Sequence, residues 1–430
     1  MKIKKYLVIL LILTSNSGLF GQYFWQRIES PTDYFLRTLH FTDSLRGWVA
    51  GDSGLIFYTS DGGVNWIQQE TNTKDKVMKL FFLDEDRGWA VAWDEVGFDT
   101  FYGTDILQTT NGGENWSLEP YREQNVFLNS IYFLDSLEGF MGGYPGKFLI
   151  TTDGGFNWED AQIDSGVGAH FPPVHFNFYN NQYGFASGGA MDISGVVWKT
   201  TNGGEFWKTT AVGPEPVRGI HFFDSLNVLG VGGDPEYFGA SVVRTTDAGE
   251  NWIYEELGIV GVATAISFRT ENEGWAPLSL ARRIMYTFDS GATWTDTSTV
   301  DSSAIYDLVF TDSLTGYAVG NEGVILKYKY QFPVPVEEEP KLADTYYLFQ
   351  NYPNPFNSST SIEYYISNPA QVSLKVYNLL GTLVANLVET YQPDGKYNVT
   401  WNADKEASGV YYLRLRVNEK EQVRKLVLLK

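Results

Sequence analysis

Three kinds of residue in this 430-residue sequence could do chemistry, and the first is a serine on a glycine turn. Ser53 lies in GDSG, residues 51–54, which has the form of a nucleophile loop. A nucleophilic serine needs a histidine base that an acid orients, and no such frame accompanies Ser53. The same position of a later repeat reads GNEG, residues 320–323, without a serine. We therefore predict an ordinary turn and assign no catalytic residue.

Histidines are the second kind. His170 and His175, in HFPPVH, are close enough in sequence to hold a metal ion together. The chain has four histidines and no cysteine, so an ordinary loop explains this pair better. We predict no metal site and no cofactor. His40 and His221 each precede a phenylalanine at the end of a predicted strand, where packing or hydrogen bonding is the simplest role.

The third kind is a set of acids and amides on tight turns. The pattern Ser/Thr-x-Asp/Asn-x-Gly-x-x-Trp occurs six times between residues 59 and 294. Its polar residues are Asp61, Asn111, Asp153, Asn202, Asp247 and Asp289, and its tryptophans are Trp66, Trp116, Trp158, Trp207, Trp252 and Trp294. A glycosidase needs two carboxylates that face one substrate across about 5 to 9.5 Å, whereas equivalent corners of successive repeats cannot converge. The polar residue instead caps backbone amides, glycine supplies a positive φ and tryptophan covers the corner. The pattern therefore predicts a structural turn and not a catalytic site.

These turns belong to a long repeat that sets the fold class. A second phrase, such as FTDSLRGW from Phe41 and FTDSLTGY from Phe310, occurs seven times. The copies are on average about 45 residues apart, which is the length of a four-stranded propeller blade. In the first repeat we predict strands at residues 35–41, 48–51 and 55–60 and after Trp66. We predict an all-β protein built on a seven-bladed β-propeller.

The two ends of the repeat array predict how the ring closes. FWQRIES, with Trp25, reads like a strand that follows one of the turns, and the last repeat stops after GVILKYKY. We infer that the N-terminal strand completes the seventh blade. This closure would hide both exposed strand edges.

The turn pattern is the Asp box, or BNR repeat, of sialidases and sortilin-like receptors. Together with the phrases between its copies, it makes residues 22–330 resemble the seven-bladed propellers of plant and cyanobacterial photosystem II assembly factors. The resemblance implies the fold, and it places the Asp-box hairpins on the rim, away from the face where such propellers bind ligands. We do not extend photosystem binding to this chain, because its export signals point outside the cell.

A second domain follows a linker. Residues 331–343 contain QFPVPVEEEPK, a proline- and glutamate-rich spacer, and residues 344–430 contain about seven strand-like runs separated by turn signals such as PDGK. In the run GVYYLRLRV, Leu413, Leu415 and Val417 are expected to face inward while Arg414 and Arg416 face solvent. We predict a small β-sandwich of immunoglobulin type.

The start of this domain carries a distinctive motif. Asn351, Tyr352, Pro353, Asn354, Pro355 and Phe356 form a proline-locked turn that presents a rigid surface. With LKVYNLLG and the basic-apolar end RKLVLLK, the motif resembles the type A C-terminal sorting domain of type IX secretion cargo. The resemblance implies that residues 344–430 bind the type IX machinery. The implied route is Sec export followed by outer-membrane passage to the cell surface or the medium.

Composition restricts location and partners. Residues 1–21 join Lys2, Lys4 and Lys5 to the apolar run LVILLIL, which is too short to span a bilayer and is typical of a cleavable signal peptide. No other segment is expected to cross a membrane. The formal net charge is −21, and the acidic residues are concentrated in residues 22–344, so a nucleic-acid partner is not expected.

The loops opposite the Asp boxes vary most and are predicted to form the binding face. Blade two has an insertion at residues 93–103 and blade five one at residues 233–239. The candidate binding residues are Trp93, Phe98, Phe101, Tyr102, Tyr144, Tyr237, Arg37 and Arg218. Exposed aromatic residues beside carboxylates suit a peptide or a sugar, and mutual packing across the channel explains them equally well.

Three functions remain open at this point. We expect an exported, non-catalytic propeller that binds a protein or a glycan. The alternative is a glycan-active hydrolase, sialidase-like or other, that uses carboxylates of the upper loops such as Asp94, Glu95 or Asp99. A passive structural module of the envelope is the third.

Overall fold

The computed structural model describes residues 24–96, 100–166, 170–236, 239–329, 346–378, 381–418 and 420–428. The chain divides into two compact units, one within Tyr23–Tyr330 and one that includes Gln331–Lys430, and each is described by itself. Apart from short 3₁₀ turns such as η1 (Asp52–Gly54) and η3 (Val300–Ser302), the elements in these ranges are β-strands. The all-β prediction is confirmed.

The described residues of the first unit form seven four-stranded sheets, which are the blades of a β-propeller. Blade one contains β2 (Leu36–Phe41), β3 (Gly47–Gly51), β4 (Ile56–Thr59) and β5 (Ile67–Gln69). Blade two contains β6 (Lys76–Phe82), β7 (Gly88–Val96), β8 (Thr100–Thr109) and β9 (Ser117–Pro120). Blade three contains β10 (Phe127–Phe133), β11 (Gly139–Tyr144), β12 (Lys147–Thr151) and β13 (Glu159–Asp160). Blade four contains β14 (Pro173–Phe178), β15 (Gly184–Ala190), β16 (Ser194–Thr200) and β17 (Lys208–Gly213).

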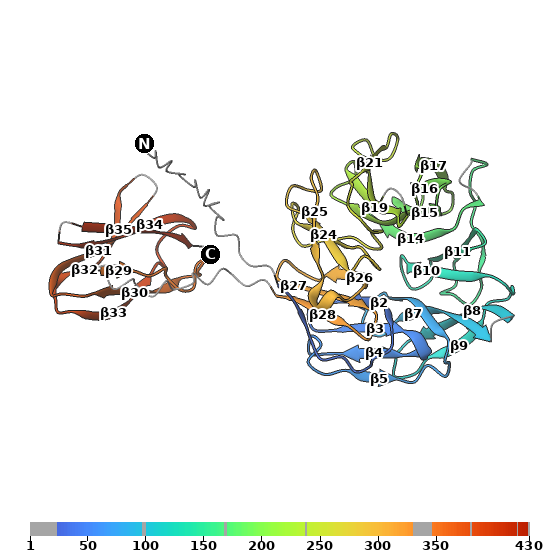
Figure 1. Ribbon diagram of the computed structural model, residues 1–430, viewed down its shortest axis with the longest axis horizontal. Coiled ribbons are helices and arrows are strands. Elements are labelled where there is room, and N and C mark those ends of the chain that lie inside the picture. The colour runs from blue at the N-terminus through green and yellow to red at the C-terminus, as the bar shows by residue number, and fades with distance from the viewer. Residues whose placement is uncertain are drawn as a thin grey trace, which may run out of the picture. The chain divides into compact units, whose positions relative to one another are not determined.

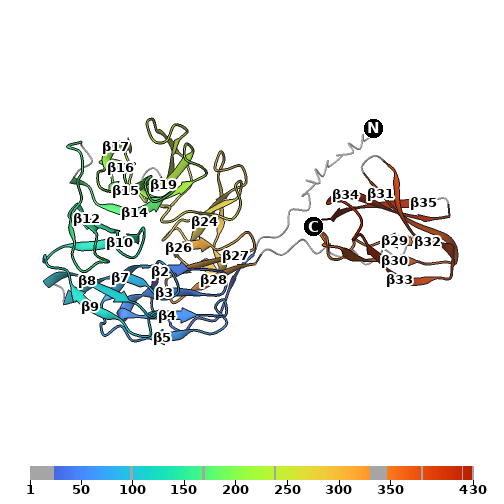
Figure 2. The same ribbon diagram turned by 180° about the vertical axis from the view of Figure 1, so that it is seen from behind.

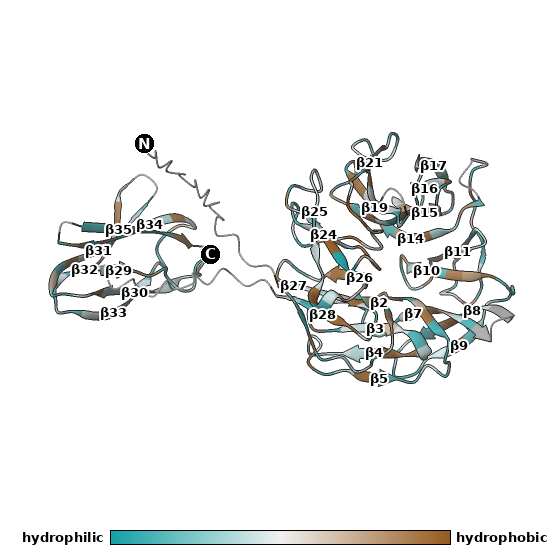
Figure 3. Cartoon of the chain, viewed as in Figure 1, coloured by the Kyte–Doolittle hydropathy of each residue, from teal (hydrophilic) through white to brown (hydrophobic). Residues whose placement is uncertain are grey.

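The remaining blades follow the same order. Blade five contains β18 (Val217–Phe222), β19 (Val228–Asp234), β20 (Gly239–Thr245) and β21 (Ile253–Glu256). Blade six contains β22 (Ser267–Phe268), β23 (Gly274–Pro277), β24 (Arg283–Thr287) and β25 (Thr295–Ser298). Blade seven contains β26 (Ile305–Phe310), β27 (Thr315–Gly320), β28 (Ile325–Lys329) and β1 (Phe24–Arg27). Figures 1 and 2 show first strands such as β2, β10, β14 and β26 facing the centre, and hydrophobic stretches lie mainly on the strands (Figure 3).

Blade seven is completed by the N-terminal strand. β1 pairs antiparallel with β28, and Trp25 lies opposite Tyr328 in the register. Trp25 is 8% exposed and packs against Trp275, Phe310 and Tyr328, with ring centres 5.3 to 6.1 Å apart. The N-terminal segment therefore satisfies the edge of β28 and buries a large aromatic side chain at the same time.

Asp-box turns connect the third and fourth strands of the first six blades. In the first turn, Thr59 Oγ1 donates to Asp61 Oδ1 at 2.9 Å and accepts the amide N–H of Gly63 at 2.9 Å. Asp61 Oδ1 also accepts the amide N–H of Asn65 at 2.9 Å. The same bonds recur at Asn111, Asp153, Asn202, Asp247 and Asp289, and the tryptophans of these turns, Trp66, Trp116, Trp158, Trp207, Trp252 and Trp294, are buried or half-buried.

Neighbouring blades meet at seams, where the second strand of one blade packs on the first strand of the next. Trp48 of blade one stacks on Phe82 of blade two, with ring centres 3.6 Å apart and planes 10° from parallel. Its indole N–H donates to the carbonyl of Gly112 in the next Asp-box turn at 3.1 Å, and Trp89 donates to Gly154 in the same way at 3.0 Å. The Asp-box turns therefore also tie consecutive blades together.

A β-bulge occurs in the first strand of six blades, where the pairing with the second strand shifts by one residue. The unpaired residues are Arg37, Met78, Asn129, Val174, Arg218 and Tyr306. Gly51 lies opposite the bulge of blade one, and a Cβ at this position would approach the carbonyl oxygen of Phe35 to 1.9 Å. This close approach explains the first glycine of GDSG. Because a bulge interrupts the alternation of a strand, it turns two successive side chains toward the channel.

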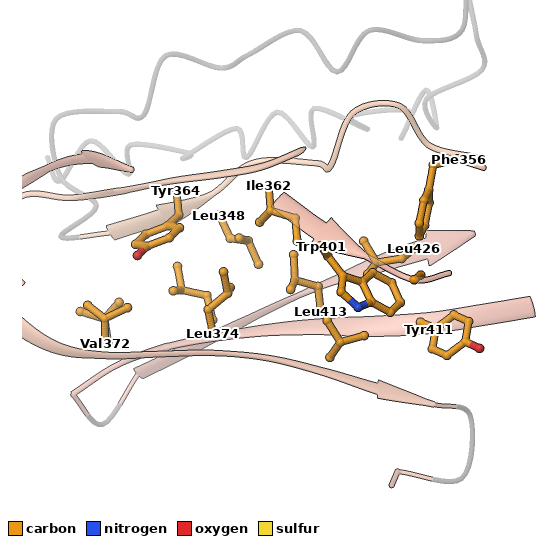
Figure 4. Packing of buried hydrophobic residues seen from close by; sticks show 14 of the residues in the cluster. Leu348, Phe356, Ile362, Tyr364, Val372, Leu374, Trp401, Tyr411, Leu413 and Leu426 are labelled. Atoms are coloured by element: carbon orange, nitrogen blue, oxygen red, sulfur yellow. The ribbon is translucent and has the colours of Figure 1, made fainter. Parts of the chain in front are cut away.

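The second unit is a β-sandwich. Its strands are β29 (Tyr346–Leu348), β30 (Ser359–Ile366), β31 (Ala370–Asn378), β32 (Leu383–Gln392), β33 (Gly395–Asn402), β34 (Gly409–Val417) and β35 (Lys420–Leu428). One sheet has the order β29-β30-β33 and the other β32-β31-β34-β35. Leu413, Leu415 and Val417 are buried as the alternation predicts, and Figure 4 shows Leu413 in the core with Ile362 and Trp401 of the other sheet.

Replacing Trp25 by alanine tests the ring closure. Trp25→Ala removes a buried indole from the closing strand and is expected to lower the free energy of unfolding by about 3–5 kcal/mol. Phe156→Ala is the control, because Phe156 is 79% exposed on an Asp-box turn, and its effect should stay within about 0.5 kcal/mol. Chemical denaturation of the two variants measures the difference. Equal effects of the two substitutions would contradict the closure.

Candidate functional site

The first strands of the seven blades surround a cavity of about 510 Å³ at the centre of the propeller. Its wall includes one residue from each blade, namely Arg37, Met78, Asn129, Val174, Arg218, Thr264 and Tyr306, and also Tyr144 from the end of β11. Of the predicted binding residues, Arg37, Arg218 and Tyr144 therefore share one cavity. Arg37 and Arg218 lie near the start of their first strands, and Tyr144 lies at the end of a second strand. Both places are at the end of the blades opposite the Asp-box turns. We call this end of the cavity the channel mouth.

On one side of the channel mouth the charged groups are paired. Arg37 Nε donates to Asp52 Oδ1 at 2.5 Å, and the guanidinium carbon lies 4.4 Å from the centre of the Phe35 ring. Deeper in the channel, Lys79 Nζ donates to Asp307 Oδ2 at 2.8 Å. Thr38 Oγ1 donates to the same oxygen at 3.2 Å. These pairs stabilise the wall and leave Arg37 with a carboxylate of its own.

On the side formed by blades three, four and five, polar atoms lack partners. Asn129 Oδ1, His175 Nε2 and Arg218 Nε are buried and make no hydrogen bond with the described residues. Burial and the nearby Lys79 ammonium lower the pKa of His175 to about 4, against the attraction of Asp307, so the imidazole is neutral at physiological pH. Burial also lowers the pKa of Arg218. Unsatisfied buried groups are costly, and a ligand that pairs with them would recover that cost.

The other predicted binding residues have different places. Trp93 Nε1 donates to the carbonyl of Leu128 at 2.7 Å, and its ring packs against Phe127 of the next blade. β7 and β8 pair as far as Val96 and Thr100, with Asp94 opposite Gly103, and residues 97–99 of the predicted insertion lie outside the described residues. Phe98 and Tyr237 lie outside the described residues, as do the side chains of Phe101 and Tyr102.

Sequence reasoning missed Asn129 and the Lys79–Asp307 pair. Its loop assignment of His175 is wrong, because His175 lies in β14 and lines the channel. Strand alternation places alternate residues on one face, whereas the bulge directs two consecutive residues to the channel. A usable signal was present: Lys79 and Asp307 each stand three residues before the phenylalanine that ends their strand, and their charges are opposite.

The catalytic candidates do not form a reactive group. Ser53 lies in the turn η1 with φ of 61°. No group of three or more potential metal ligands occurs in the described ranges. The Asp-box acids are used by their own turns. Hydrogen bonds from the amide and the side chain of Asn65 lower the pKa of Asp61 to about 2.

The upper-loop acids Asp94 and Asp105 lie close to Asp75, outside the wall of the central cavity. Burial, followed by the charge of Asp75 and a hydrogen bond with it, raises the pKa of Asp105 to about 6. Two carboxyl groups in direct contact leave no room for a sugar between them, unlike the separated pair of a glycosidase. The side chain of Glu95 and residue Asp99 lie outside the described part of the structure.

In the second unit the sorting motif is divided between buried and exposed residues. Asn351 is 2% exposed, and its Nδ2 donates to the carbonyl of Pro353 and to Thr360 Oγ1, each at 2.9 Å. Phe356 is 2% exposed and packs against Trp401. Asn354 and Phe356 also bond to the backbone of β35, so the motif and the C-terminal strand form one surface. Tyr352, by contrast, is 82% exposed.

Comparison with known proteins identifies both units. Residues 68–221 match the family described as photosynthesis system II assembly factor YCF48, and residues 350–429 match the family described as secretion system C-terminal sorting domain. The chain joins a YCF48-like propeller to a type IX sorting domain. This sorting domain points to secretion or to the cell surface. In the ranges for which coordinates are described, no helix has the length and hydropathy to cross a membrane.

The relatives of the YCF48-like propeller are distant. The photosystem II assembly lipoprotein Ycf48 of Nostoc sp. is 28% identical over 321 residues, which cover 71% of this chain and 86% of that protein. The Ycf48 lipoprotein of Synechococcus sp. is 28% identical over 148 residues, which cover 34% of this chain and 40% of that protein. A solved structure titled YCF48 bound to D1 peptide aligns with a TM-score of 0.55 at 20% identity, covering 71% of this chain and 97% of its own. That structural likeness shows the fold alone.

The Asp105 carboxyl provides a test of the acid cluster. Its pKa of about 6 lies above the ordinary value of 3.8, so the folded protein holds a proton between these values that the unfolded chain releases. Stability should therefore fall as pH rises through about 6. Asp105→Asn is expected to remove this dependence and to be more stable than the native protein at pH 7.

Thermal unfolding between pH 4 and 8 measures the effect. Glu119→Gln, an exposed acid on the same blade, is the control and should leave the pH profile unchanged. If the stability of the Asp105→Asn variant still fell with rising pH as in the native protein, Asp75, Asp94 and Asp105 would not be coupled.

Proposed function

We propose that this protein is an exported, non-catalytic propeller that binds an extended protein segment carrying a carboxylate at the channel mouth. The observation that carries the proposal is Arg218. Its guanidinium is largely withdrawn from solvent, its Nε has no partner in the described part of the chain, and Tyr144, 47% exposed, lies on the same cavity. A carboxylate is the group that an arginine fork binds best, because two N–H groups can donate to it in parallel.

The surrounding charges favour a ligand with one negative group over a polyanion. The chain has a net charge of −21, which repels strongly acidic partners over long distances. Arg37 at the channel mouth is already paired with Asp52, and Lys79 deeper in the channel is paired with Asp307. Arg218 feels the charge of Glu215 but forms no ion pair with the described residues, and its Nε has no hydrogen-bond partner among them. A single carboxylate, at a chain end or on one acidic side chain, matches this arrangement. Asn129 Oδ1 is an acceptor suited to an N–H group of the bound backbone.

The propeller fold is compatible with peptide binding, but the same fold also occurs in enzymes. The relative titled YCF48 bound to D1 peptide holds a peptide, and we extend peptide binding, but not that partner, to this chain. A GH74 xyloglucanase from Xanthomonas campestris has a similar TM-score of 0.55 at 11% identity, so enzymes use comparable folds. Because the acids of blade two contact one another outside the central cavity, we propose the binding role over glycan hydrolysis. Turnover on a glycan panel would reverse this choice.

Arg218 and Asp52 allow a paired test of the channel mouth. Arg218→Gln is expected to weaken binding of acidic peptides about tenfold or more, because it removes a charged hydrogen bond. Asp52→Asn frees Arg37 and should strengthen binding of the same peptides. The full chain would be screened against a peptide array with free and amidated C-termini and with acidic residues replaced by amides. A glycan array is screened in parallel.

Arg122→Gln is the control, since Arg122 is exposed and does not line the cavity. Loss of binding in Arg218→Gln with gain in Asp52→Asn supports the proposal. Peptide binding that neither substitution changes, or binding to glycans alone, would contradict it.

The sorting motif generates a second test, on delivery. We propose that Tyr352 is the residue of the motif that the type IX machinery contacts, because Asn351 and Phe356 are buried and hold it in place. Tyr352→Ala should leave the melting temperature unchanged and reduce the fraction of protein outside the cell in a host with this secretion system. Phe356→Ala should instead unfold the sandwich by creating a cavity worth about 3–5 kcal/mol. Normal export of Tyr352→Ala would remove Tyr352 from this role.

A further inference from the structure

The seam between blades five and six differs from the other seams. The second strand of blade five carries Leu229 where blades one and two carry Trp48 and Trp89. A cavity of about 430 Å³ lies beside Leu229, on the Asp-box end of the blades. Its wall includes Phe223, Val228, Leu229, Arg244, Asn272 and Ser290. His221 and Phe223 pack on Phe268 at this seam, but the second strand lacks the aromatic side chain that blades one and two have there.

A second substitution leaves the same seam unbridged. At the seam between blades one and two, Arg46 forms an ion pair with Glu85 across the groove. The corresponding residues in blades five and six are Asn227 and Glu271. Asn227 Nδ2 donates to Asp224 Oδ2 in its own turn at 2.7 Å and does not reach across. The cavity is therefore open to the Asp-box face.

Arg244 supplies a cation inside this cavity. It precedes the threonine of its Asp box, and at three other seams the polar residue in this place bonds to the following blade. These bonds join Gln108 to Gly154 at 3.2 Å, Lys199 to Glu250 at 2.6 Å and Lys327 to Gly62 at 2.7 Å. Arg244 Nη2 is buried and has no hydrogen-bond partner in the described residues. Burial lowers the pKa of Arg244, and the charges of Glu255 and Asp289 oppose this effect.

The acids near Arg244 are engaged elsewhere. Asp224 accepts the amide N–H groups of Leu226 and Asn227 at 2.7 and 2.8 Å. Asp289 accepts from the amide and hydroxyl of Thr293 at 2.8 and 2.7 Å. Glu271 is exposed to water. A buried arginine N–H group therefore remains available to a ligand.

We propose that this seam binds a planar aromatic monocarboxylate, with the ring in the place of the missing indole and the carboxylate on Arg244. Ser290 occupies the position of Gly112 and Gly154, whose carbonyls accept an indole N–H at the other seams. A ring with an N–H group therefore suits the site. The cavity volume falls within the range of about 300–1,000 Å³ found for small-ligand pockets. The site is on the opposite end of the blades from the channel mouth and does not depend on peptide binding there.

Calorimetric titration of the full chain tests the site, with indole-3-acetate as probe and indole-3-acetamide as its neutral counterpart. The acid is expected to bind about tenfold more tightly than the amide, because a hydrogen bond to a charged group is lost in the amide. Arg244→Gln should abolish this difference. Leu229→Trp should fill the cavity and prevent binding of both compounds, and Leu229→Phe serves if the tryptophan variant does not fold. Lys199→Gln at the neighbouring seam is the control and should bind like the native chain.

Two results would overturn the proposal. One is the absence of binding, or equal affinity for acid and amide, in the native chain. The other is binding of the acid that persists unchanged in a folded Leu229→Trp or Leu229→Phe variant.

Discussion

The antiparallel pairing of β1 with β28 is the constraint on which the rest of the propeller depends. The last blade reaches four strands only if both ends of the unit contribute to it, and here β1 joins β26, β27 and β28. Trp25 brings a buried aromatic ring to the join, so the closure combines backbone hydrogen bonds with apolar burial. Without it, the first strands of the blades would not be held around one channel, and the groups on its wall would not meet.

Within the closed ring, the repeat imposes the same local structure on every blade, and the two proposed binding sites lie where the repeat is broken. The seams show this most directly. Trp48 and Trp89 pack in their seams and bond to the next Asp-box turn. Leu229 is buried but has no side-chain donor for such a bond, and a cavity lies beside it. The channel mouth follows the same principle. Arg37 and Arg218 occupy equivalent bulges, but Arg37 forms an ion pair with Asp52 whereas Arg218 Nε has no hydrogen-bond partner among the described residues.

The two units differ in the kind of surface that they offer to a partner. The propeller has acidic surroundings with a few cations directed inward, an arrangement that disfavours polyanions and leaves room for single carboxylates. The sandwich buries the anchors of its sorting motif against β35 and leaves one tyrosine exposed on a fixed loop. The exposed Tyr352 side chain has no role in packing. An aromatic residue held on a fixed loop suits recognition by another protein.

Much of the fold follows from the sequence, because its determinants are local. The Asp-box octets contain their own hydrogen-bond partners within seven residues, and the alternation of Leu413, Leu415 and Val417 sets the inward face of β34 without reference to any other segment. The sorting motif is equally compact. Composition and periodicity therefore determined an all-β propeller with N-terminal closure and a terminal sandwich. The resemblance of the sandwich to a sorting domain points to secretion or to the cell surface. What only the tertiary structure decided is which polar groups meet and which stay unpaired. Lys79 contacts Asp307 across 228 positions of sequence. The β-bulges, which the alternation of side chains along a strand does not predict, direct His175 and Arg218 into the channel. The reason is geometric: side-chain direction in a ring depends on the register of each strand pair and on the closure of all seven sheets, and neither is a property of a short stretch of sequence.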